Sequence, residues 1–192
     1  EPDDAKQQWM LIDDDNRFQK EVIGPVVQEY IGEYGIPEKL LSTHIHDLTF
    51  QKFWANYTGV GEYQALHNHN AVFSFVVWLK VPSCAKEEQS VPDTMHPEAG
   101  NFILQYTDIT GRCRKQSWTL EQQYNEGHML LFPSCLYHAV YPHFLTEEKR
   151  LSVAGDIAIN SMLLKGISDQ GMPLGPCNSQ EFLKKDSGKA HI

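Results

Sequence analysis

From residue 49 onward the chain consists of short runs of aromatic and β-branched residues, and this texture constrains the fold more than any other feature. Each run has the length of a strand and is bounded by glycine or proline, which interrupt regular structure. Strands at this spacing predict an antiparallel sandwich or barrel. The runs are 50–57, 73–81, 102–106, 129–132, 139–141 and 151–159.

The residues before this region have a helical periodicity instead. Apolar side chains recur every four positions from Asp13 to Tyr34, which predicts an amphipathic helix. Gly24-Pro25 lies within it, and because proline lacks an amide proton and clashes with the preceding turn, we expect a kink or a new start there. Gly35 and Pro37 should end the helix. The predicted fold class is therefore α+β, mainly β, with amino-terminal helices packed on one side of the strands.

The length of 192 residues is sufficient for one domain with its own hydrophobic core. We therefore expect a single domain over residues 1–192. Its expected parts are supporting helices at 13–42, a core of strands at 49–160 and a weakly specified tail at 166–192. Within the core we expect a long loop at 83–98 and a charged segment outside the strands at 108–127, placed to cover a site.

Charge and cysteine content argue against several classes of protein. The formal net charge of -9 makes nucleic acid a poor main partner. No run approaches the ~20 apolar residues that a membrane span requires, so we expect no membrane partner. The four cysteines include no Cys-x-x-Cys pair, which fits reduced thiols and a cytoplasmic location better than a disulfide framework or a zinc ribbon.

Five polar residues occupy positions that this strand pattern would bring together at one end of the predicted sandwich or barrel. His67 and His69 come just before the second run, and residues two apart on a strand point to the same face. His138 stands at the end of another predicted strand. Arg150 and Ser152 are again two apart, at the start of the last run.

This set of residue types suits a mononuclear non-haem Fe(II) site. Iron held by three protein ligands on one face keeps its other positions open for a chelating cosubstrate and O2, and imidazole suits Fe(II). A guanidinium can hold a carboxylate bidentately, and a hydroxyl can donate a further hydrogen bond. We therefore predict that His67, His69 and His138 bind iron and that Arg150 with Ser152 anchors a dicarboxylate.

Four motifs in this order carry a family resemblance: Trp54-Ala55-Asn56-Tyr57, His67-Asn68-His69, Glu126-Gly127-His128-Met129-Leu130-Leu131-Phe132-Pro133-Ser134 leading to His138, and Arg150-Leu151-Ser152. With them the segment from about Phe53 to Ile159 resembles the Fe(II)- and 2-oxoglutarate-dependent dioxygenases, within them the prolyl-hydroxylase-like group that includes small bacterial and phage members. The resemblance implies a double-stranded β-helix, or jelly roll, with supporting helices.

The resemblance also implies an activity. Such an enzyme uses Fe(II), 2-oxoglutarate and O2, with ascorbate in support, to hydroxylate a C–H bond of a peptide residue such as proline, or of a small molecule, and releases succinate and CO2. Tyr57 and Trp78 are the further expected contacts of the cosubstrate.

Position 69 departs from the family pattern, because most members have Asp or Glu where this chain has His69. Asp156 shares a strand face with Arg150, so it could orient a ligand or cap an internal hydrogen bond.

Other interpretations of the histidines remain open. His44 and His46, next to Asp47, form a rival metal pair that lacks a downstream Arg-x-Ser motif. Three-histidine ligation also fits a cupin-type dioxygenase or lyase that binds its substrate to the metal without 2-oxoglutarate. A third alternative is a non-catalytic jelly-roll binding module with packed histidines. His128 and His143 are expected to be a strand start and a turn residue.

Overall fold

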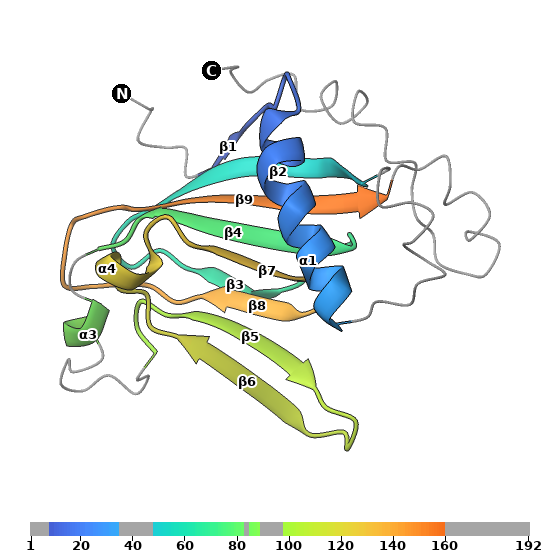
Figure 1. Cartoon of the computed structure of the whole chain (residues 1–192). Helices are drawn as coiled ribbons and strands as arrows, with labels where there is room; N and C mark the ends of the chain where they lie inside the picture. The colour runs from blue at the N-terminus through green and yellow to red at the C-terminus, as the bar shows by residue number, and fades with distance from the viewer. Residues whose placement is uncertain (1–7, 35–47, 83–84, 89–97, 160–192) are drawn as a thin grey trace.

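The computed structural model describes residues 8–34, 48–82, 85–88 and 98–159. This part is mainly β: two antiparallel sheets lie against each other and few helices accompany them (Figure 1). One sheet has the order β1-β2-β9-β4-β7, and the other has the order β3-β8-β5-β6. The strands are β1 Gln8–Met10, β2 Leu48–Thr58, β3 Gln64–His67, β4 Phe73–Lys80, β5 Phe102–Thr107, β6 Cys113–Trp118, β7 Met129–Pro133, β8 Tyr137–Val140 and β9 Arg150–Ile159.

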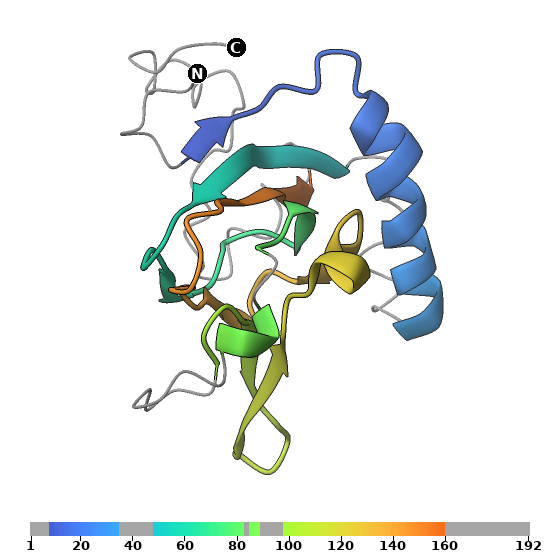
Figure 2. The same ribbon diagram turned by 90° about the vertical axis from the view of Figure 1, so that its left-hand side faces the viewer.

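All six predicted strands are present, with ends shifted by a few residues, whereas β1, β3 and β6 were not predicted. The segment 108–127 is not an excursion over a site, because its middle part is β6, which pairs with β5 in a hairpin that projects from the sheets (Figures 1 and 2). It was missed because most of its side chains are polar and exposed. The short helices α3 (Ala85–Glu88) and α4 (Gln122–Asn125) also fall in segments expected to lack regular structure.

The predicted amino-terminal helix is present, and its irregularity has a different form from the one expected. The chain stays helical through Gly24-Pro25, with a π-helical turn η1 (Gln19–Ile23) leading into α1 (Gly24–Tyr34). The Gly24 amide donates to the Gln19 carbonyl, one residue further back than in an α-helix. We attribute this wider turn to Pro25, whose ring would crowd the carbonyl four residues before it. None of the described helices is long and apolar enough to cross a membrane.

Alternation along the strands creates two apolar layers. Ile23 and Val27 of the helical segment pack against the outer face of the larger sheet, which contributes Phe73, Phe75 and Ile157 (Figure 2). The second layer lies between the two sheets. Its buried members include Trp54, Trp78, Phe102, Leu104 and Phe132. Because successive side chains point to opposite faces, β9 directs Val153 and Ile157 toward the helix, whereas Arg150, Ser152 and Asp156 line a cavity together with Ala154 of the second layer.

Gly155 of β9 has no room for a side chain, and it provides a test of this packing. A Cβ atom there would lie 2.6 Å from Phe75 Cε1 and 2.9 Å from the Lys52 carbonyl oxygen. We expect Gly155→Ala to lower the free energy of unfolding by about 1–3 kcal/mol, measured by equilibrium urea denaturation. Gly32→Ala is the matched control, because its Cβ would meet nothing within 4 Å on α1 and should stabilise the protein slightly. Equal stability of the two variants would contradict the packing described.

Candidate active site

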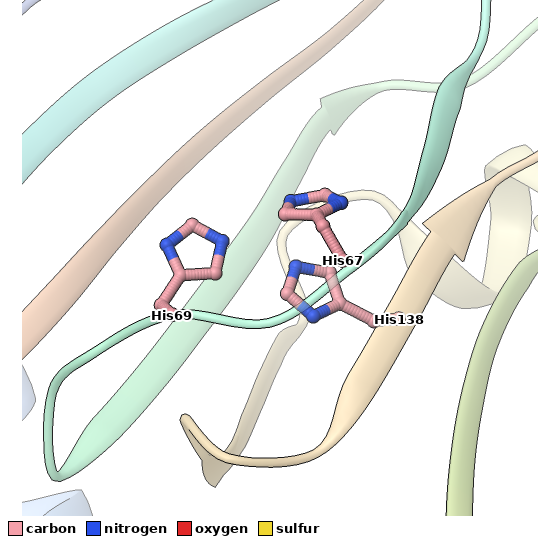
Figure 3. Close-up of side chains that lie close together, drawn as sticks. All are labelled: His67, His69 and His138. Atoms are coloured by element: carbon pink, nitrogen blue, oxygen red, sulfur yellow. The ribbon is translucent and has the colours of Figure 1, made fainter.

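Three histidines from two segments gather at one end of the space between the sheets. His67 ends β3 and pairs with His138 of β8, and His69 follows two residues after His67 (Figure 3). One ring nitrogen from each lies within 4.8 Å of the others. The predicted convergence is confirmed, but the expected reason was wrong for His69, which lies beyond the strand. Its amide donates instead to the Ser134 carbonyl at 3.0 Å, and this bond fixes the turn.

Each of the three rings already has a hydrogen-bond acceptor at its Nδ1 atom. Oxygen acceptors at Nδ1 favour the tautomer with its proton there, so Nε2 of each ring keeps a lone pair that can bind a metal. The Nδ1 contacts are His67 to the Ala65 carbonyl at 2.6 Å, His69 to Asp156 Oδ2 at 2.7 Å, and His138 to the Leu136 carbonyl at 3.3 Å.

The environment of His138 keeps its imidazole neutral. Burial, and after it the proximity of His67, lowers the pKa of His138 from its usual 6.5 to about 4. At neutral pH the ring therefore carries no extra proton that a metal ion would have to displace. Neutral imidazole is the form that binds metals.

A cavity next to the histidines has one polar wall and several aromatic ones. Trp54, Trp78, Phe102 and Phe132 supply the aromatic surface. The polar wall comes from β9 and its neighbour β2, and includes Arg150 and Ser152. Such a site can hold a small polar molecule against the polar wall and limit the access of water.

Arg150 is an unusual residue in this wall, because its guanidinium is buried with unused donors. The residue is 2% exposed, and only Nη2 has an acceptor, the Tyr141 carbonyl at 3.2 Å. Nε and Nη1 are buried and find no acceptor within the described residues. Burial lowers the pKa of Arg150 to about 10, which still leaves it charged at neutral pH. A carboxylate in the cavity would accept from one of these unused donors and balance the buried charge, so the site fits an anionic ligand.

The remaining predicted contacts have different outcomes. Trp78 lines the cavity as expected, with its ring edge-on to Phe102. Tyr57 does not line it, because Tyr57 points to the opposite face of β2. Its neighbours Asn56 and Thr58 line the cavity instead, paired with Ser152 and Arg150 on β9. Alternation counted from Trp54 would have identified both residues.

The geometry agrees with what a comparison of families finds. A family model described as "Putative 2OG-Fe(II) oxygenase" matches residues 52–156, more than half of the chain. The chain belongs to this family. A comparison with curated protein sequences finds no significant match.

Several solved structures are similar to this chain. A prolyl-4-hydroxylase from Pseudomonas putida shares 13% identity over 83% of this chain and 76% of its own, with a TM-score of 0.45. An oxidoreductase of the 2OG-Fe(II) oxygenase family from Burkholderia pseudomallei shares 12% over 68% of this chain, with a TM-score of 0.43, and the match spans 50% of its own length. HygX from Streptomyces hygroscopicus, with nickel and 2-oxoglutarate bound, shares 14% over 70% of this chain and 69% of its own, with a TM-score of 0.40.

Two buried residues interact electrostatically with Arg150 and were not recognised in the sequence. His143, expected in a turn, is 1% exposed, and its Nε2 bonds to the Glu148 carbonyl at 2.8 Å. Glu88 of α3 is fully buried and accepts the backbone amides of Phe144 and Leu145. Its charge also raises the pKa of Arg150, against the larger lowering by burial. The loop before β9 is thus held in place behind the guanidinium.

The other histidines and the cysteines lie away from this cavity or outside the described residues. His44 and His46 fall in the segment 35–47, outside the described part, so the rival metal pair is not placed. His128 is exposed directly before β7, as expected. Cys113 and Cys135 are exposed free thiols.

Proposed function

We propose that this oxygenase binds one Fe(II) through His67, His69 and His138 and hydroxylates a C–H bond with 2-oxoglutarate and O2. The observation that carries the proposal is the pairing of three convergent imidazoles with a buried arginine that has two unused donors. The family match supports the same cofactor and cosubstrate. Bound Fe(II) would supply the activation of O2, coupled to release of succinate and CO2.

The protein's own residues have three tasks in this proposal. Arg150 holds the far carboxylate of 2-oxoglutarate through its guanidinium, which has unused donors at Nε and Nη1, with the hydroxyl of Ser152 on the same face of β9. The histidine Nε2 atoms hold the metal. The aromatic walls exclude water from the reacting centre.

We also propose that the eight strands β2 to β9 form a double-stranded β-helix. The support is their distribution over the sheets: β2, β4, β7 and β9 are in one, and β3, β5, β6 and β8 are in the other. This winding brings the end of β3, the middle of β8 and the start of β9 to one mouth. The proposed substrate is a peptide residue, such as a prolyl residue, or a small molecule, and its support is the family resemblance.

A second candidate is a three-histidine dioxygenase that binds its substrate to the metal without 2-oxoglutarate. It is favoured by one observation, namely that the cluster of possible ligands contains three imidazoles and no carboxylate. In that case Arg150 would hold a carboxylate of the substrate itself.

Anaerobic titration distinguishes the two candidates. The protein with Fe(II) should develop a visible charge-transfer band when 2-oxoglutarate is added, and admission of O2 with ascorbate should then produce succinate. The control is glutarate, which has the same two carboxylates but lacks the keto oxygen needed for chelation and should give no band. Absence of both the band and succinate at millimolar 2-oxoglutarate would contradict the first candidate and favour the second.

A further inference from the structure

The three histidines differ in the group that accepts a hydrogen bond from Nδ1. His67 and His138 direct Nδ1 to backbone carbonyls, which are neutral, whereas His69 directs Nδ1 to the Asp156 carboxylate at 2.7 Å. Asp156 is 2% exposed. Of the described residues that line the cavity, it is the only acidic one. The position beside His69 therefore carries the negative charge that the three imidazoles lack.

Asp156 is held so that it remains behind His69. It pairs with Ser74 across β9 and β4, and the Ser74 hydroxyl donates to Asp156 Oδ1 at 2.8 Å. Ser134 Oγ lies 2.9 Å from Ser74 Oγ, and both serines are buried. With one oxygen on Ser74 and the other on His69, the carboxylate is kept from turning toward the other histidines.

The His69 ring is fixed on its face as well. The Trp54 ring stacks on it, with ring centroids 5.7 Å apart and an interplanar angle of 11°. The carboxylate fixes the rotation of the imidazole within its plane, and the indole fixes the plane. A metal ligand oriented in this way loses little freedom on binding, and a carboxylate at Nδ1 makes Nε2 a stronger electron donor.

We propose that Asp156 is a positioning residue that orients His69 for the metal and supplies, through this hydrogen bond, the negative charge that three neutral imidazoles lack. This inference rests on the proposed iron site. A carboxylate ligand would bring one negative charge into direct contact with the metal. Here the same charge stands one hydrogen bond further out, so Fe(II), dianionic 2-oxoglutarate and Asp156 together carry a net charge of -1, as they would with a carboxylate ligand.

The first test removes the charge and keeps the shape. We expect Asp156→Asn to lower the affinity for Co(II), followed by its visible spectrum, by about ten- to a hundredfold. Ser74→Ala, which frees one carboxylate oxygen, should have a smaller effect in the same direction. Asp108→Asn is the control, because that carboxylate lies on the exposed β5–β6 turn and should leave the affinity unchanged. Circular dichroism establishes that each variant is folded.

The second test uses a double-mutant cycle. His69→Ala removes the ring through which Asp156 acts, and the weaker Co(II) binding of this variant is measured at millimolar metal. If Asp156 acts through His69, Asp156→Asn weakens binding in the wild-type background and has little further effect in the His69→Ala background.

The outcomes separate this inference from the function on which it rests. If the wild-type protein binds Co(II) but Asp156→Asn leaves the affinity unchanged in both backgrounds, Asp156 has no positioning role while the iron site stands. If Asp156→Asn lowers the affinity equally in both backgrounds, its effect is structural, and the inference is overturned. If the wild-type protein binds no Co(II), both the iron site and the inference are wrong.

Discussion

The His138→Ala variant is expected to lose Fe(II) binding at micromolar metal, a loss in affinity of more than about a hundredfold, and His67→Ala should behave alike. In the proposed site one ring nitrogen from each histidine would bind the ion, and two remaining imidazoles would not hold it against water. His138 has the larger structural role, because it pairs with both β3 and β5 in the sheet. Its removal also leaves a buried space, so the loss of metal must be measured on folded protein.

Metal content after anaerobic loading and desalting, together with the thermal unfolding profile, gives the measurement. His128→Ala is the matched control, because it removes an exposed histidine from the same chain. Wild-type protein and the control should each retain about one Fe(II) per chain. Full stoichiometry in both His67→Ala and His138→Ala, with loss in His44→Ala, would transfer the metal site to His44 and His46.

Strands and helix could be predicted where burial leaves an apolar pattern in the sequence. The buried strands β4, β5 and β9 are short apolar runs, and the helix that packs on the larger sheet has apolar residues at helical spacing. The strands β3 and β6 are at the edges of the smaller sheet and are mostly polar or exposed, so no such pattern marks them. Their places are set by pairing with strands distant in the sequence.

The site could be predicted as a set of residue types, but not in its detailed geometry. His67, His138 and Arg150 are where the motif order predicts them. The prediction of Tyr57 missed the cavity by one position along β2, because neighbouring residues of a strand point to opposite faces. Glu88 comes from a segment with no periodic signal, and only the tertiary fold brings it to the loop before β9.

The same limit applies to Asp156. Its alternation with Arg150 placed it on the inner face of β9, but the sequence left two roles open, to orient a ligand or to cap an internal hydrogen bond. The structure shows that one carboxylate makes both contacts, with His69 on one oxygen and Ser74 on the other. That arrangement requires the turn after β3 to lie beside β4 and β9, which no local pattern encodes.

Arg150→Lys is expected to weaken 2-oxoglutarate binding by about ten- to a hundredfold, or ~1–3 kcal/mol, and to leave Fe(II) binding nearly intact. The ammonium retains the charge but not the planar guanidinium, so it cannot present two parallel N–H donors to one carboxylate. It also lacks a rigid tie to the Tyr141 carbonyl, which now holds the third guanidinium nitrogen.

The charge-transfer band at increasing 2-oxoglutarate concentration measures this effect directly, because it reports cosubstrate bound beside the metal. Lys149→Arg is the matched control, since it makes a conservative cation change at the exposed neighbouring position. The Arg150→Lys variant should need ten- to a hundredfold more 2-oxoglutarate to reach half of the maximal band intensity, and it should keep one Fe(II) per chain. This is the result expected when the anchor of the far carboxylate is weakened and the metal ligands are unchanged. An unchanged titration would mean that the guanidinium does not hold the cosubstrate. Because its buried donors would then still require an anionic partner, the carboxylate of a substrate bound to a three-histidine metal would become the better explanation of why Arg150 points into the cavity.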